Sequence, residues 1–261
     1  MFPTTNFTAG LEGAQGRVGA AIQRASARTG VDFSYLFNQA KVESGLNPLA
    51  RARTSSATGL FQFIDQTWLG TVKKHGEAHG LGWAADAISR GADGRYRVAD
   101  PGMRHAILDL RNQPEAASAM AAEFASDNQA HLETSLGRPV ESVDLYLAHF
   151  LGAGGAAKFL RAHDANPDGA AAAALPEAAR ANRWVFFDRD GSARSFAEIR
   201  ERFAAKIGGS AAPLPVRGVG EMEFTPLRLA SLNSGATAPV QKLPSPQYAR
   251  LAYLMLAELG A

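Results

Sequence analysis

The sequence contains no cysteine. Disulfides, thiolate metal sites and a cysteine nucleophile are therefore excluded together. Charge is also scarce, because charged residues make up 20% of the 261 residues and the formal net charge is +2. No run of Lys and Arg is interleaved with aromatic residues, which disfavours a nucleic-acid partner.

Long apolar runs are missing as well. No stretch approaches the roughly 20 apolar residues of a membrane-spanning helix. Residues 1–30 hold no apolar segment of the length that a secretory signal needs. For action outside the cytoplasm, we therefore expect either export by a non-Sec route or a sequence from which a signal has been removed.

What the sequence has is a hydrophobic content of 46%, typical of a folded protein, arranged with helical spacing. Capping residues, first-turn prolines and apolar residues three and four apart predict a mainly α fold. The predicted helices cover residues 14–29, 32–44, 65–74, 101–110, 114–136, 141–149 and 195–206. A connection is expected over 163–174, and a short strand pair or an extended loop over 184–191.

The composition changes after Gly208, since six of the thirteen prolines fall in the last 54 residues. Residues 210–246 are typical of an extended linker or a strap, and a final amphipathic helix is expected over 247–259. Its apolar face would dock on the parent domain or bind a protein partner. We therefore divide the chain into a catalytic domain, 14–207, and a Pro-rich C-terminal extension, 208–261, that ends in a helix.

The segment 40–68, AKVESGLNPLARARTSSATGLFQFIDQTW, is the most informative. It presents one carboxylate, Glu43, at the end of a helix, and a small-residue loop and a GLFQF segment follow. Apolar neighbours such as Val42, Leu46 and Phe61 would withdraw Glu43 from water, as a general acid for a glycosidic oxygen requires. Taken alone, Glu43 would nevertheless be an ordinary helix-end carboxylate.

The motifs ESGLNP and SATGLFQF resemble those of the family 1 lytic transglycosylases, which share the lysozyme-like fold of goose-type lysozyme. By this resemblance, which spans roughly 18–160, Glu43 is the catalytic acid and base. Gly59 would allow a close backbone approach, and Gln62 would bind glycan or close a loop. We predict that substrate is bound by Ser44, Ser56, Gly59, Gln62, Phe63, Tyr146 and His149.

A third family motif, Ala-Tyr-Asn-Ala-Gly, corresponds to AHFLGAGGA at 148–156. Here His149 stands at the tyrosine position and Phe150 at the asparagine position. His149 would hydrogen-bond Glu43 or substrate, or serve as a structural histidine. Tyr146, one helical turn earlier, is an alternative source of the hydroxyl.

The family implies cleavage of the β-1,4 bond between N-acetylmuramic acid and N-acetylglucosamine in peptidoglycan glycan strands, with a 1,6-anhydro product and no cofactor or metal. The site of action would be the periplasm or cell wall. A hydrolytic muramidase remains an alternative if a second carboxylate faces Glu43, for which the candidates are Asp65, Glu77, Asp86 and Asp93; Asp65 is better explained as a helix N-cap. The other alternative is a catalytically silent murein-binding module of an envelope machine or phage particle.

Two further patterns carry less weight. The HGEAH segment at 75–79 matches neither zinc-protease motif, so no metal site is predicted there. The GAGG segment at 152–155 follows a helix rather than a strand, which disfavours a phosphate-binding loop.

Overall fold

A computed structural model of the protein describes residues 5–53 and 55–208. The fold is mainly α and lysozyme-like, as the sequence predicts. The helices are α1 (Thr5–Thr29), α2 (Phe33–Ser44), α3 (Asp65–His75), the 3-10 turn η1 (Glu77–His79), α4 (Gly82–Ala87), α5 (Pro101–Asp109), the 3-10 turn η2 (Leu110–Asn112), α6 (Pro114–Leu136), α7 (Ser142–Ala165), α8 (Ala171–Ala174), α9 (Pro176–Ala181), α10 (Arg183–Phe186) and α11 (Phe196–Ile207).

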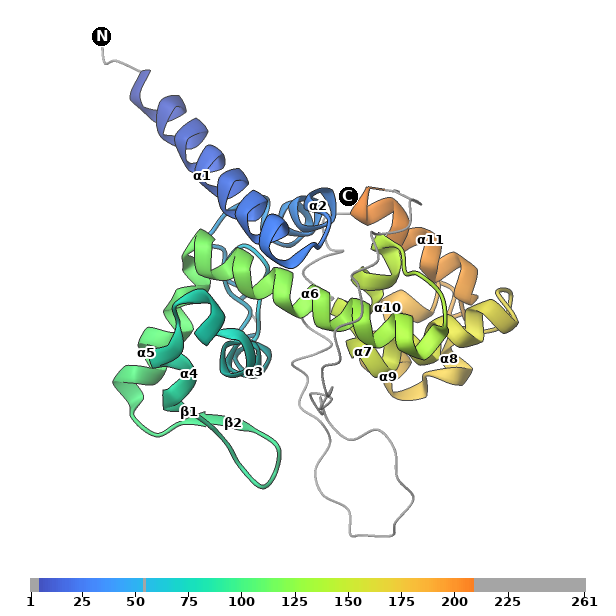
Figure 1. Cartoon of the computed structure of the whole chain (residues 1–261). Helices are drawn as coiled ribbons and strands as arrows, with labels where there is room; N and C mark the ends of the chain where they lie inside the picture. The colour runs from blue at the N-terminus through green and yellow to red at the C-terminus, as the bar shows by residue number, and fades with distance from the viewer. Residues whose placement is uncertain (1–4, 54, 209–261) are drawn as a thin grey trace.

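Helix α6 crosses the middle of the molecule (Figure 1). Helices α3, α4 and α5 gather at one end of it and α7 to α11 at the other, while α1 packs along it. The buried residues of α6, which run from Ala116 to Leu132, explain this position, because they face helices on several sides. The architecture therefore has two lobes joined by one central helix.

Several predicted helix ends are confirmed by their caps. Asp32 accepts a hydrogen bond from the Tyr35 amide at the start of α2, and Ser195 and Glu198 form a capping box on α11. Pro101 and Pro114 lie in the first turns of α5 and α6. Local capping chemistry was thus enough to place these boundaries.

Several parts of the fold differ from the sequence predictions. Helix α1 begins at Thr5 rather than at residue 14, and the short helices α4 and α8 were not predicted. Segment α7 continues to Ala165 rather than ending at 149, but as two helical stretches that meet at a kink, where Gly152 has a non-helical φ of 74°. Residues 183–186 form one helical turn rather than a strand, and only Phe187 pairs with Ala193. A hairpin of β1 (Ile88–Arg90) and β2 (Tyr96–Val98) was not predicted.

Helix α11 braces α7 from behind. Arg200 reaches from α11 to Asp144 of α7, whose side chain has no exposed surface. The Phe203 ring packs against Tyr146 and Phe150 at centroid distances of 5.7 and 5.1 Å. This brace fixes the face of α7 that turns toward α2. The predicted strap and final helix of 208–261 lie outside the described residues.

Candidate active site

Glu43 lies in the last turn of α2, which ends because Gly45 adopts the left-handed conformation at φ 61°. Leu46 continues in that region at φ 64°, a conformation that side chains rarely adopt. The chain therefore turns sharply after Glu43. The Glu43 side chain itself has no exposed surface.

Two side chains from α7 approach one oxygen of Glu43, and one of them, Tyr146, forms a hydrogen bond with it. The Tyr146 hydroxyl donates to Glu43 Oε1 at 3.3 Å, and His149 Nε2 lies 3.2 Å from the same oxygen. The two rings stack with an interplanar angle of 5°. Glu43 Oε2 is buried and has no hydrogen-bond partner among the described residues. The carboxylate thus has one oxygen held by the protein and one left for another group.

Sequence reasoning missed a further member of this cluster, Gln39. Its amide Nε2 lies 3.1 Å from His149 Nδ1, on the ring side opposite Glu43. Gln39 precedes Glu43 by four residues and therefore shares its face of α2. That spacing is the signal by which Gln39 could have been found.

The tyrosines at the site remain neutral phenols. Burial, and then the negative charge of Glu43, raise the pKa of Tyr35 far above its usual range. The same two causes, in the same order, raise the pKa of Tyr146 well above 10. Tyr146 therefore stays a hydroxyl donor to Glu43 across the whole neutral range.

Ser44 turns its hydroxyl back into its own helix, where it donates to the Ala40 carbonyl at 2.9 Å. This contact occupies the single hydroxyl hydrogen, and only the oxygen lone pairs remain for another partner. Binding of substrate by Ser44 stays a prediction.

The loop after α2 is closed by Gln62, which is buried and holds φ at 47°. Its amide nitrogen donates to the carbonyls of Gly59 at 2.8 Å and Ala50 at 3.2 Å. This is the loop-closing role considered for Gln62. A contact of its remaining oxygen with glycan stays a prediction.

Gly59 allows a close backbone approach, and the group that approaches it is the Arg111 backbone of the same protein. Gly59 holds φ at 83°, and a Cβ atom at this position would collide with the Arg111 carbonyl oxygen. The glycine therefore lets the loop lie directly against the end of α5 and η2.

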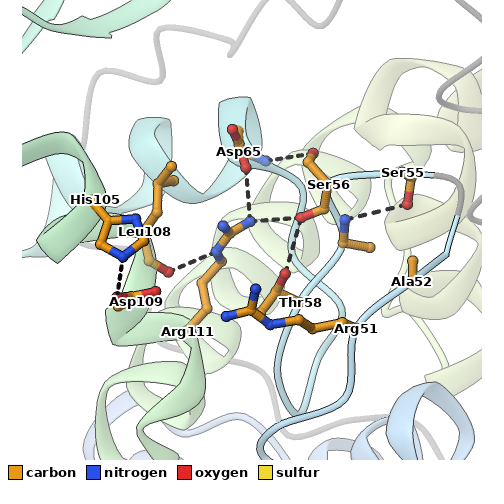
Figure 2. A pocket seen from close by; sticks show the side chains of 11 residues that line it. Arg51, Ala52, Ser55, Ser56, Thr58, Asp65, His105, Leu108, Asp109 and Arg111 are labelled. Atoms are coloured by element: carbon orange, nitrogen blue, oxygen red, sulfur yellow. Dashed lines mark hydrogen bonds and ion pairs between the residues drawn. The ribbon is translucent and has the colours of Figure 1, made fainter. Parts of the chain in front are cut away.

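Arg111 anchors the other side of this loop (Figure 2). Its guanidinium donates to the carbonyls of Ser56 and Phe63 and pairs with Asp65 at 3.0 Å. Burial lowers the pKa of Arg111, and the charge of Asp65 opposes that effect. No sequence pattern pointed to Arg111, because its partners are mostly backbone carbonyls far away in the chain.

Two predicted substrate residues take part in this anchoring. The Ser56 hydroxyl accepts a hydrogen bond from the Asp65 amide. The Phe63 ring is 5% exposed and packs edge-on against Trp68 and Phe124, so little of it is free to meet glycan.

Asp65 is not the N-cap that the sequence suggested. Ile64 occupies the cap position without a side-chain hydrogen bond, and Asp65 is the first helical residue. Its carboxylate pairs instead with Arg104 at 2.6 Å and with Arg111. The attraction of two guanidinium groups outweighs a local cap.

A cavity of about 280 Å³ opens beside the anchored loop. Figure 2 shows the side chains around it, among them Arg51 and Ser56 from the loop and His105, Asp109 and Arg111 from α5 and η2. Its lining does not include Glu43. The cavity is therefore a feature of the loop rather than of the carboxylate site.

The other carboxylates considered as partners of Glu43 are exposed rather than placed beside it. Asp93 forms an exposed ion pair with Arg97 at 2.6 Å, and Glu77 and Asp86 are exposed. In the described part of the chain, the contacts of the Glu43 carboxylate come from Tyr146 and His149 and from no second carboxylate.

The HGEAH segment is tied to α6. His75 pairs with Asp127 at 2.9 Å and with Glu123 at 3.3 Å, and His79 pairs with Glu123 at 2.8 Å. Within residues 5–53 and 55–208, no group of three His, Asp or Glu side chains is placed to hold a metal ion. The two histidines therefore connect α3 and η1 to the central helix.

Part of the chain matches a known family. Residues 20–86 match the family model described as the transglycosylase SLT domain. The resemblance to lytic transglycosylases is thereby confirmed over a segment that contains Glu43, Ser44, Gly59 and Gln62. Tyr146 and His149 lie beyond the matched residues, and the fold alone brings them to Glu43.

Proposed function

We propose, on the premise that residues 20–86 form a transglycosylase SLT domain, that the protein is a peptidoglycan lytic transglycosylase with Glu43 as its general acid and base. A transglycosylase-type activity on peptidoglycan is what the domain supports in general. The choice of bond, the anhydro product and the role of Glu43 are our proposal.

The observation that carries the proposal is the unequal surroundings of the two Glu43 oxygens. Oε1 accepts a hydrogen bond from the Tyr146 hydroxyl and lies near His149 Nε2. Buried Oε2 has no hydrogen-bond partner among the described residues. An enclosed carboxyl group with one free oxygen suits proton transfer to a group placed beside it. An ordinary helix-end carboxylate would instead be solvated.

In the first step, protonated Glu43 would give its proton to the glycosidic oxygen as the bond to the muramoyl anomeric carbon breaks. The N-acetyl carbonyl oxygen of the same sugar would attack that carbon and form a cyclic oxazolinium ion. The protein then needs no carboxylate nucleophile. The contacts of Glu43 agree with this, because they come from Tyr146 and His149.

In the second step, ionised Glu43 would accept the proton of the muramoyl C6 hydroxyl while that oxygen attacks the anomeric carbon. The oxazolinium ring opens and the N-acetyl group is restored. Tyr146, a neutral phenol, and His149 would stabilise the carboxylate between the two steps. The products are a 1,6-anhydro-muramoyl end and a free N-acetylglucosamine 4-hydroxyl, and Glu43 is protonated again.

The same proposal places the site of action at the murein of the cell wall. None of the described helices is both long and apolar enough to cross a bilayer. A partner bound through residues 247–259 stays a prediction.

Digestion of purified sacculi, followed by mass spectrometry of the released muropeptides, tests the proposal. We expect wild type to release products that are one water lighter than hydrolysis products, and Glu43→Gln to release none. Clearing by Glu43→Gln would contradict the role of Glu43. Binding of sacculi without cleavage by wild type would indicate the silent module instead.

A further inference from the structure

Gln39 makes a contact that the reaction scheme above does not use. Its side chain is buried, and among the described residues its hydrogen-bond contact is with His149 Nδ1 at 3.1 Å. The amide oxygen of Gln39 is buried without a partner. Burying this oxygen without a hydrogen bond destabilises the fold. The Gln39 amide nitrogen nevertheless lies beside the imidazole.

The direction of each hydrogen bond in this cluster follows from Tyr146. A neutral phenol has one hydrogen, and Tyr146 donates it to Glu43 Oε1. Oε1 therefore acts as an acceptor. His149 Nε2 lies 3.2 Å from the same oxygen, although the pair does not have hydrogen-bond geometry. A hydrogen on Nε2 makes this short contact attractive, whereas a bare nitrogen lone pair would repel the carboxylate oxygen.

A neutral imidazole has a hydrogen on only one nitrogen. With Nε2 protonated, His149 Nδ1 is a bare acceptor, and the partner that suits it is a donor. Gln39 Nε2 is that donor. With the Gln39 amide reversed, its oxygen would accept from Nδ1–H, and bare Nε2 would compete for the proton of Glu43.

We propose that Gln39 is a positioning residue that fixes the tautomer of His149, so that the Nε2–H side of the imidazole faces Glu43 Oε1 and the transferable proton of Glu43 is carried by Oε2. The catalytic meaning of this inference rests on the proposed function. The tautomer itself does not, because it follows from the contacts alone.

Two variants of Gln39 separate tautomer control from simple packing. Gln39→Met keeps the length of the side chain and removes the hydrogen bond. Gln39→Glu places a carboxylate beside Nδ1 and reverses the donor at that end. Gln129→Met is the matched control, since Gln129 is also a buried glutamine, on α6, and donates to Glu133 at 3.1 Å.

Long-range proton–nitrogen correlation spectra of histidine-labelled protein report which imidazole nitrogen carries hydrogen. His149→Asn assigns the signal among the six histidines. We expect Nε2–H with bare Nδ1 in wild type and in Gln129→Met, and a protonated Nδ1 in Gln39→Glu. A protonated Nδ1 in neutral wild-type His149, or an unchanged tautomer in Gln39→Glu, would overturn the inference.

Kinetics on soluble glycan strands complete the test. We expect Gln39→Met to lower kcat about tenfold with KM within about twofold, the scale of one lost hydrogen bond, and Gln129→Met to leave both unchanged. Full kcat in a folded Gln39→Met would remove the catalytic role. If wild type cleaves no glycan but keeps the Nε2–H tautomer, the proposed function fails while the assignment of the tautomer stands.

Discussion

The two carboxylate oxygens of Glu43 have different surroundings. Oε1 lies against two side chains of α7, and Oε2 faces no described partner. A carboxyl group in such surroundings has a defined direction for its proton. The resemblance of ESG and GLFQF to a family pointed to Glu43, but the asymmetry depends on residues more than 100 positions away in the chain.

Tyr146→Phe removes the hydroxyl that donates to Glu43 and keeps the packing of the ring on Phe203. Loss of one donor to a developing carboxylate should lower kcat by about tenfold to a hundredfold, with a small change in melting temperature. Steady-state cleavage of glycan strands measures this. Tyr96→Phe, on the hairpin, is the control. Equal rates for the Tyr146 variant and wild type would assign the donor role to His149 alone.

Gly59→Ala should destabilise the fold by about 2–4 kcal/mol, because the new Cβ collides with the Arg111 carbonyl at a positive φ. Gly19→Ala is the matched control. Gly19 lies in α1 with nothing within 4 Å of an added Cβ, so alanine should stabilise by about 0.5–1 kcal/mol. Urea unfolding of both variants measures the difference. The same sign of change in the two would contradict the close-approach explanation.

At the scale of elements, the helices were predictable because their caps are local. Asp32, Ser195 and the two first-turn prolines act within four residues of themselves. At Gly152, a φ of 74° interrupts the helical backbone of α7, a conformation that glycine readily adopts, and a second helical stretch follows to Ala165. The β1–β2 hairpin escaped prediction because each strand is only three residues long and carries no clear alternation of apolar residues.

The contact between α3 and α6 depends on charge rather than on apolar packing alone. Burial by itself would raise the pKa of Asp127, but hydrogen bonds from His75 and Lys74 outweigh it and lower that pKa. A lowered pKa in the folded state stabilises the protein fully above the ordinary Asp value of about 3.9. The stabilisation is lost as pH falls through the folded-state pKa.

Asp127→Asn should therefore cost about 1–2 kcal/mol at pH 5, where Asp127 is ionised, and much less at pH 2. Urea unfolding at the two pH values measures both differences. Asp109→Asn is the control, because Asp109 forms an exposed pair with His105 at 3.0 Å and should change stability little. A cost of Asp127→Asn that does not shrink at pH 2 would contradict the charge-based contact.

At the scale of the whole molecule, α6 holds two lobes so that the end of α2 faces α7 (Figure 1). The sequence predicted the helical class and the acid, but not the arrangement of side chains around it. Gln39 and Arg111 were missed because their partners lie far away in the chain, at His149 and at the loop carbonyls of Ser56 and Phe63. Such contacts have no local pattern, whereas a cap or a family motif does.

Digestion of murein in water enriched in oxygen-18 tests the central claim most directly, because it asks which oxygen closes the reaction. Attack by the muramoyl C6 hydroxyl takes no oxygen from solvent. We therefore expect unlabelled, anhydro-terminated products from wild type and none from Glu43→Gln. Products that carry one oxygen-18 at the reducing end would show that water attacks, and would make the protein a muramidase instead.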